Sequence, residues 1–353
     1  MVIGGGIVGL CTALAAADRQ LQVTVADDAQ PGAASRASAG MLAPSLDGLP
    51  ATVRAIAIAA RDMYPEFIAR LLDSSGIAVP LDRGGILEVA ASEADLETRR
   101  ARAGSEALAL TADELARLEP ALAGHAGAIH HPLDGAVDNV SLMDALWIAA
   151  QRHPRIDVVR HHVASVDLAG NRTCTTLSNG TRIESGCIVV ATGAWARLTG
   201  APHPIQVRPL KGELLTLDRV PIAHVVYGEA GYLVPRGETL LVGATSEDAG
   251  FDPGATAAGR KQLREAASAL VPTLGSAAIL EHWAGLRPVS PDGVPILGRD
   301  RELSALIYAC GFSRNGILLG PWAGEALAAS IASETVNTLP REFHPDRFEN
   351  RNC

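Results

Sequence analysis

The chain of 353 residues contains few cysteines and few aromatic residues. Its five cysteines are an odd number and form no Cys-x-x-Cys pair. This usage argues against a disulfide scaffold and against a structural zinc site. Each cysteine is therefore interpreted as a small apolar side chain, and no metal site is expected.

Long apolar runs and blocks of like charge are also missing. No apolar stretch reaches the roughly 18 residues that a membrane-spanning helix needs, and the first residues lack the basic region of a signal peptide. The formal net charge is −9, whereas nucleic-acid phosphates require a basic surface. We therefore expect a cytoplasmic protein with no membrane span and no nucleic-acid partner.

The remaining composition is that of a globular protein, with 48% hydrophobic and 20% charged residues. At roughly 150 residues per domain, the length predicts two domains with well-filled cores. The 35 glycines and 21 prolines follow no period, which excludes a collagen-like chain.

The N-terminal segment predicts a strand, a glycine turn, a helix and a second strand. The helix is expected over residues 7–18 and the second strand over residues 23–26. The turn has GxGxxG spacing, formed by Gly4, Gly6 and Gly9. The first glycine permits the tight turn, the second lets the backbone approach a pyrophosphate, and the third lets the helix pack against the sheet. This order predicts a dinucleotide site, the alternative being a glycine-rich turn of another α/β protein.

An acidic residue follows the second strand at the spacing of a ribose-binding acid. Asp27 comes 18 residues after Gly9, and an acid here favours a ribose with a free 2′-hydroxyl. Its neighbour Asp28 is either part of this site or a solvated loop acid. Only three residues precede Gly4, although strands run to about five or six residues. We therefore expect a few further native residues before Met1.

Residues 31–42 form a segment of small residues, with the sequence PGAASRASAGML. Small side chains let the backbone approach a flat ligand closely. Together with the N-terminal unit, the segment resembles the flavin-approach loop of the D-amino-acid-oxidase-like flavoenzymes, and this resemblance implies FAD and not a nicotinamide cofactor. The alternative is a mobile surface loop.

Beyond residue 50 the sequence predicts helices over residues 51–74, 92–118, 140–152, 259–270 and 323–335. It predicts strands over residues 84–90, 158–159, 181–183, 187–195, 214–217, 232–235, 239–244 and 306–308. Pro65 interrupts the first helix, Ser141 is a candidate N-cap, and Asn179-Gly180 predicts a hairpin turn. We infer a nucleotide-binding domain made of discontinuous pieces, with a mixed sheet inserted.

An ordered set of motifs spans nearly the whole chain: GGGIVG, ASAGML, GGILEV, VVATGAW, KGELL, YLVPR, LLVGAT, WAGLRP, DGVPILGR and RNGILL. With this set the chain resembles the D-amino-acid-oxidase-like FAD-dependent oxidoreductases, and among them the glycine oxidases of thiamine biosynthesis. The resemblance implies an α/β fold, with a Rossmann-like FAD-binding domain and an inserted antiparallel-sheet substrate domain. The FAD-binding domain would comprise residues 1–50, 128–200 and 285–353, and the substrate-binding domain residues 51–127 and 201–284.

The same resemblance implies roles for individual residues. Arg287 would hold the substrate carboxylate, because a guanidinium grips a carboxylate through two hydrogen bonds. Tyr232 would add a hydroxyl hydrogen bond, and the backbone carbonyl of Arg314 would receive the substrate amine. The residues that would contact FAD are Ile7, Val8, Asp27, Asp28, Ala34, Ser35, Ala39, Gly40, Met41, Val163, Phe312, Ser313, Arg314, Asn315, Gly316, Ile317 and Leu318.

Each of these roles has a structural alternative. Arg287 alternatively pairs with an acid such as Asp292, Tyr232 packs in a sheet, and Arg314 is a surface arginine. The pair His161-His162 has no metal-ligand spacing and is interpreted as strand or loop.

The activity implied by the resemblance is oxidative deamination of glycine to an imine and then a 2-oxo acid, with ammonia and hydrogen peroxide as the other products. Dioxygen is the expected acceptor, no side chain is needed as a general base, and a homotetramer is implied. Ala230 and Ser246 stand where glycine oxidases carry bulkier residues, so sarcosine and small D-amino acids are further candidate substrates. The alternatives are a D-amino-acid dehydrogenase that reduces a quinone, a nicotinamide-dependent dehydrogenase, and a non-catalytic flavin-binding subunit.

Overall fold

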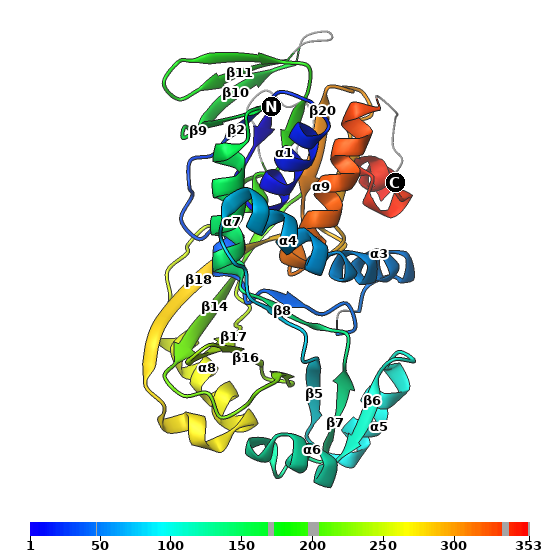
Figure 1. The fold of residues 1–353 in the computed structure, drawn as a ribbon, viewed down its shortest axis with the longest axis vertical. Coiled ribbons are helices and arrows are strands. Elements are labelled where there is room, and N and C mark those ends of the chain that lie inside the picture. The colour runs from blue at the N-terminus through cyan, green and yellow to red at the C-terminus, as the bar shows by residue number, and fades with distance from the viewer. Residues whose placement is uncertain (47, 169–172, 197–204, 334–338, 352–353) are drawn as a thin grey trace.

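The computed structural model describes residues 1–46, 48–168, 173–196, 205–333 and 339–351 (Figure 1). Within these ranges, the strands form a six-stranded sheet, an eight-stranded sheet and two three-stranded sheets. None of the helices described there has the length and apolar composition to cross a bilayer. The expectation of an α/β fold with an inserted sheet is confirmed.

The six-stranded sheet holds the N-terminal strand at its centre. Its order is β19 (Ile296–Arg299), β20 (Leu306–Cys310), β13 (Ile188–Val190), β1 (Val2–Ile3), β2 (Val23–Ala26) and β9 (Ile156–Val159). All neighbours pair in parallel except β19 and β20. Both faces are covered, which explains why β1, β13 and β20 are apolar throughout.

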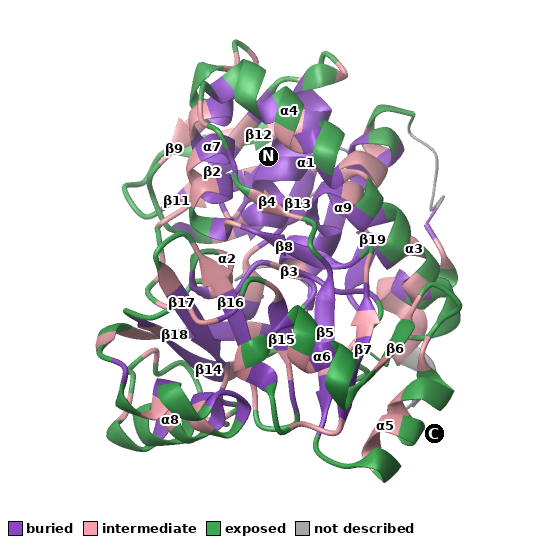
Figure 2. Ribbon diagram, turned by 60° about the horizontal axis from the view of Figure 1, so that its bottom comes forward, coloured by how far each residue is buried: buried purple, intermediate pink, exposed green. Residues whose placement is uncertain are grey.

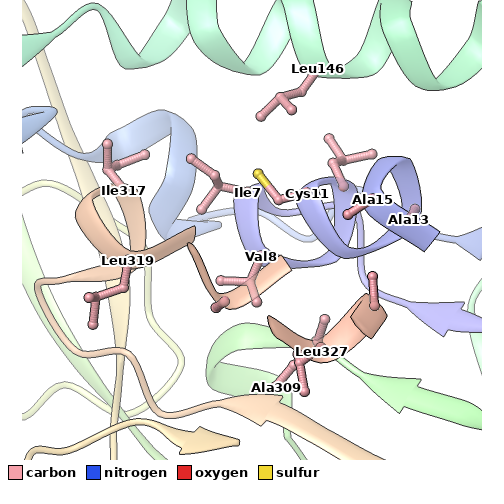
Figure 3. Packing of buried hydrophobic residues seen from close by; sticks show 14 of the residues in the cluster. Ile7, Val8, Cys11, Ala13, Ala15, Leu146, Ala309, Ile317, Leu319 and Leu327 are labelled. Carbon is pink, nitrogen blue, oxygen red and sulfur yellow. The ribbon is translucent and has the colours of Figure 1, made fainter. Parts of the chain in front are cut away.

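One face of this sheet packs against helices α1 (Ile7–Asp18) and α9 (Gly316–Ala332), which lie side by side in Figure 1 although they come from opposite ends of the chain. Glycine makes this contact close, because a Cβ on Gly324 would lie 2.6 Å from the carbonyl carbon of Cys11. Figure 3 shows the side chains of Ile7 and Cys11 between Ile317 and Leu146 in the core. The predicted bounds of α1 and β2 are confirmed.

Helix α9 begins at Gly316, seven residues before the predicted start at Ala323, and Pro321 lies inside it. A proline has no N–H for the carbonyl four residues earlier, which here belongs to Ile317. The Tyr64 hydroxyl donates to that carbonyl at 2.5 Å and replaces the missing bond. The predicted start was therefore wrong because a distant tyrosine stabilises the first turns. The predicted end at Thr335 lies outside the described residues.

Helices α3 (Ala51–Asp62) and α4 (Tyr64–Ser75) divide just before Pro65, as predicted. Helix α7 (Asn139–Arg152) begins one residue before the predicted helix. The proposed N-cap Ser141 was wrong, because the Asp138 carboxylate accepts from the backbone N–H groups of Val140 and Ser141.

The opposite face of the six-stranded sheet is covered by a three-stranded sheet of β10 (Val163–Asp167), β11 (Thr173–Leu177) and β12 (Arg182–Ser185). Strands β11 and β12 pair antiparallel through the predicted Asn179-Gly180 turn, where Gly180 has φ +84°. The other three-stranded sheet contains β3 (Met41–Leu42), β8 (Gly135–Val137) and β4 (Leu81–Asp82).

The eight-stranded sheet has the order β18 (Ile279–Val289), β14 (Arg208–Leu217), β17 (Thr239–Gly243), β16 (Tyr232–Arg236), β15 (Val225–Tyr227), β5 (Ile86–Ala90), β7 (Gly127–His131) and β6 (Leu108–Thr111). One face packs on helix α8 (Ala257–Leu270), and the other faces the small sheet of β3, β8 and β4. Strands β14 and β18 pair antiparallel over ten residues, which brings Gly212 opposite Gly285.

The single helix predicted over residues 92–118 was wrong. The segment contains α5 (Glu93–Arg102), the strand β6 and α6 (Ala112–Leu118). Strand β6 pairs with β7 at the edge of the large sheet, and Thr111 and Glu114 form a capping box that starts α6. Helix α5 buries no residue and is exposed along most of its length in Figure 2.

Candidate functional site

One cavity of about 990 Å³ joins the N-terminal glycine turn to strands β14, β16 and β18 of the large sheet. It is lined by every predicted site residue except two: Gly4, Gly6, Ile7, Val8, Asp27, Asp28, Ala34, Ser35, Ala39, Gly40, Met41, Val163, Tyr232, Arg287 and Phe312 to Ile317. Gly9 packs against the turn instead, and Leu318 is buried in the core beside α1. A direct FAD contact is therefore not expected for Leu318.

The glycine turn at one end of the cavity leaves no room for side chains. Gly4 has φ +108°, and a Cβ on it would lie 2.3 Å from the carbonyl oxygen of Ala191. A Cβ on Gly9 would lie 1.9 Å from the carbonyl oxygen of Gly4. The N-cap Gly6 offers no side-chain hydrogen bond, and the first turn of α1 carries no acid. The positive end of α1 is therefore directed at the cavity and suits a pyrophosphate.

The acids after β2 lie at the same end. The Asp27 carboxylate is partly exposed and lies 3.6 Å from the guanidinium of Arg160. The Asp28 carboxylate is not a freely solvated loop acid, because it lies 2.8 Å from the His162 imidazole and accepts from Gln30 at 2.6 Å. His162 lies in the loop before β10 and lines the cavity, in agreement with its interpretation as strand or loop.

The small-residue segment 31–42 forms a fixed wall of the cavity and contains the short helix α2 (Ala34–Ala37). The buried Asn139 amide donates to the carbonyls of Ser35 and Arg36, both at 2.9 Å. The guanidinium of Arg236 donates to the Ala39 carbonyl at 2.7 Å, and the Trp283 indole donates to the Ala37 carbonyl at 3.0 Å. The alternative of a mobile surface loop was therefore wrong, because three distant side chains hold the segment.

Arg287 enters the other end of the cavity from β18. Its guanidinium donates to the carbonyl oxygens of Thr245 at 3.1 Å and Lys211 at 3.4 Å. No carboxylate of the described residues forms an ion pair with it, and Asp292 pairs with Arg347 instead. The alternative pairing of Arg287 with Asp292 was therefore wrong. Burial lowers the pKa of Arg287 from its ordinary value, because the guanidinium loses its hydration and no carboxylate among the described residues pairs with it.

Tyr232 lies at the start of β16 with its ring over Gly243, where a Cβ would meet the phenol at 2.3 Å. Its ring stacks on Tyr227 with centroids 6.5 Å apart. Burial raises the pKa of Tyr232 to about 12, and the nearby charges of Arg287 and Arg314 oppose this rise. The phenol is therefore a neutral hydrogen-bond donor at ordinary pH.

Arg314 lies in the loop between β20 and α9. Ser313 before it adopts φ +49°, a left-handed conformation that costs energy for a residue with a side chain. The Ser313 N–H donates to the Pro288 carbonyl at 2.8 Å, which fixes this loop beside β18. Arg314 is exposed, as the alternative of a surface arginine expected, and it also lines the same cavity as Tyr232 and Arg287.

Several residues of the cavity had no clear signal in the sequence. Trp195 and Phe251 line it with ring centroids 5.8 Å apart, and Phe251 lies in a loop without a periodic pattern. Gly212 lies beneath the Arg287 guanidinium, because a Cβ on it would be 2.3 Å from both terminal nitrogens. The motif KGELL contains Gly212, but only the pairing of β14 with β18 shows what it contacts.

One cavity is lined by a nucleotide-binding glycine turn and by an arginine without an acidic partner among the described residues, which suits a dinucleotide-dependent enzyme that acts on a small acid. Comparison with known sequences identifies the group. The sequence model of the family described as FAD dependent oxidoreductase matches residues 1–330, and the chain belongs to this family. FAD is therefore the cofactor.

Some relatives are matched over nearly their whole length, whereas others are much longer than this chain. The glycine oxidase of Geobacillus kaustophilus is 33% identical, with 93% of this chain and 91% of that protein covered. The bifunctional protein ThiO/ThiG of Trichormus variabilis is 32% identical over 99% of this chain, which spans only 55% of that protein. The solved structure of the Geobacillus kaustophilus glycine oxidase has a TM-score of 0.91 at 29% identity and covers 98% of this chain and 97% of that one.

Proposed function

We propose that the protein oxidises glycine with FAD and dioxygen, and that it supplies glycine imine for the thiazole unit of thiamine. The observation that carries the proposal is one cavity that is lined both by the glycine turn and by Tyr232, Arg287 and Arg314. The names of the glycine oxidase and ThiO/ThiG relatives agree with it.

The residues present fit FAD along the length of the cavity. The α1 N-terminus and the compact turn at Gly4 suit the pyrophosphate, and Asp27 suits the ribose. The fixed wall of segment 31–42 suits the flat ring, because its small side chains let the backbone approach closely. When bound, FAD accepts the α-hydrogen of the substrate as hydride and passes both electrons to dioxygen.

Arg287 and Tyr232 bind and orient the substrate. The guanidinium of Arg287 has no carboxylate partner among the described residues, so a substrate carboxylate is its complement. The neutral phenol of Tyr232 donates a hydrogen bond to the same carboxylate. The Arg314 carbonyl accepts from the substrate amine, which must be neutral to lose hydride from its α-carbon. Water then hydrolyses the imine to glyoxylate and ammonia.

The substrate range follows from the small residues near Tyr232. Ala230 and Ser246 both line the cavity, where the bulkier residues of glycine oxidases would take more of its volume. Sarcosine and small D-amino acids are therefore further substrates in this proposal. The domain boundaries expected from the sequence, the homotetramer and the cytoplasmic location stay predictions.

The proposal is tested by reconstituting the protein with FAD and following peroxide and ammonia with glycine, sarcosine and D-alanine. In Arg287→Ala, the glycine KM should rise by at least about 100-fold while FAD stays bound, because a charge-assisted pair is lost. The exposed Arg182→Ala on β12 is the control and should leave KM unchanged. If the protein forms no peroxide but rapidly reduces a quinone, it is a dehydrogenase and not an oxidase. An oxidised flavin that no amine reduces anaerobically would indicate a non-catalytic flavin protein.

A further inference from the structure

An ionic cluster lies behind Arg287 and consists of the buried Lys211 and Glu213 and the half-buried Glu247, with the His282 imidazole 2.8 Å from Glu213 Oε2. Lys211 is 1% exposed and Glu213 is fully buried. The Lys211 ammonium lies 3.1 Å from Glu213 Oε1 and 2.9 Å from Glu247 Oε2. Such a cluster is weak evidence for stability, because burying the charges costs about as much as their attraction returns. A contribution to stability therefore does not explain why these charges are held together at this position.

The cluster holds the two carbonyl groups that accept hydrogen bonds from Arg287. Lys211 and Glu247 exchange backbone hydrogen bonds, both at 2.9 Å. The Thr245 hydroxyl donates to Glu247 Oε1 at 2.6 Å and accepts from the Glu213 N–H at 2.9 Å. The Arg287 guanidinium donates to the Lys211 and Thr245 carbonyls. Among the described residues, both carbonyl groups that accept hydrogen bonds from Arg287 therefore belong to residues that the cluster holds in place.

The same cluster holds the far end of the loop that follows Thr245. The Lys211 ammonium donates to the Gly254 carbonyl at 3.1 Å. The Glu213 carboxylate accepts from the N–H and the hydroxyl of Thr256, the N-cap of α8. Ser246 and Phe251 lie between these two anchors and line the cavity. Lys211 therefore ties together both ends of a cavity-lining loop.

Lys211 also balances charge close to Arg287. Its ammonium neutralises one of the two carboxylates of Glu213 and Glu247, both of which lie within 3.1 Å of it. Without the ammonium, two carboxylates would face Arg287 and compete with any carboxylate that enters the cavity. At the low effective dielectric of a buried site this competition is stronger than in water.

We propose that Lys211 is a positioning residue that sets the Arg287 guanidinium for carboxylate binding and shapes the loop beside it. The proposal rests on the carboxylate-binding role given to Arg287 in the proposed function. Lys211 touches neither substrate nor FAD in this proposal and acts through the carbonyls and charges around Arg287.

The test uses FAD-loaded protein and acetate as a carboxylate that cannot react. The dissociation constant of acetate is measured from the change in flavin absorbance, and KM and kcat are measured with glycine. In Lys211→Met, the acetate constant and the glycine KM should both rise by at least about tenfold, as expected for coupled neighbours, while kcat changes little. The double variant Lys211→Met/Glu247→Gln removes one carboxylate together with the ammonium, which restores the wild-type net charge, and it should recover most of the affinity.

A matched control is Glu119→Gln. Glu119 is buried like Lys211 and Glu213 and accepts hydrogen bonds from the backbone of Ala223 and His224, but it has no part in the Arg287 network. Its substitution should lower the melting temperature and leave the acetate constant unchanged. If Lys211→Met does not fold, Thr245→Val gives the test, because it removes the link to Glu247 and keeps all charges.

The outcomes separate the two proposals. Unchanged acetate affinity in Lys211→Met, or in Thr245→Val where that variant replaces it, overturns the positioning role. A double variant no better than Lys211→Met would also overturn it, because the loss would then not arise from charge. A wild-type protein that binds acetate but does not oxidise glycine contradicts only the proposed function. Unchanged acetate affinity in Arg287→Ala contradicts both.

Discussion

Substituting Gly212 with alanine should reduce activity without reducing stability. Gly212 lies in the interior of β14, directly beneath the Arg287 guanidinium. Its backbone is not in the left-handed region, so alanine adopts the same conformation without strain. Loss of freedom in the unfolded chain should then stabilise the protein by about 0.4–1 kcal/mol, provided that the guanidinium gives way.

The size of the effect on activity follows from the space that the new methyl group takes. A Cβ at position 212 would lie 2.3 Å from Nη1 and Nη2 of Arg287, whereas ordinary contact begins at 3.4 Å. The guanidinium must therefore retreat by about 1 Å. A misplacement of this size costs on the order of 100-fold in rate, or about 2.7 kcal/mol of transition-state stabilisation. We expect kcat/KM for glycine to fall by that factor in Gly212→Ala.

The assay is peroxide formation from glycine by FAD-loaded protein, with the melting temperature and flavin content of each variant measured in parallel. Gly104→Ala is the control, because an added Cβ there meets no atom within 4 Å. It should leave kcat/KM unchanged. A Gly212→Ala enzyme with kcat/KM within twofold of wild type would refute the reasoning, because it would show that the position of Arg287 over β14 does not matter for catalysis.

Two further substitutions, at Tyr232 and Asn139, test the substrate side of the cavity and the wall formed by residues 31–42. Burial raises the pKa of Tyr232 to about 12 from 10.0, so its stabilising contribution is complete below pH 10 and is lost as pH rises through 12. Tyr232→Phe should therefore lose less stability than wild type over this range in urea titrations, and equal losses would contradict the prediction. Asn139→Ala removes both hydrogen bonds to the turn at Ser35 and should weaken FAD binding by about tenfold. Quenching of flavin fluorescence measures this affinity, and an unchanged value would show that Asn139 does not hold the wall for FAD.

The N-terminal unit was predictable because its determinants are local. Helix α1 and strand β2 have the predicted bounds, since the glycine turn, the alanine-rich run and the apolar strand each specify their conformation within a few residues. The hairpin at Asn179-Gly180 was predictable for the same reason.

The errors occur where a distant partner overrides the local pattern. The predicted start at Ala323 misses the first seven residues of α9, where the Tyr64 hydroxyl satisfies the carbonyl that Pro321 leaves without a donor. The alanine and arginine content of residues 92–118 predicts one helix, but pairing with β7 makes Leu108–Thr111 a strand. Neither partner can be recognised from the residues that it changes.

The candidate site was predictable as a set of motifs but not as an arrangement, and the reason is strand register. KGELL and WAGLRP are separated by about 70 residues, and each alone is an ordinary strand sequence. Their antiparallel pairing puts Gly212 opposite Gly285, so that the guanidinium of Arg287 and the wall at Ala37 both lie against bare backbone. A shift of one residue would turn each of these side chains to the other face of the sheet. The positions of Lys211 and Gly212 relative to Arg287 therefore depend on this register.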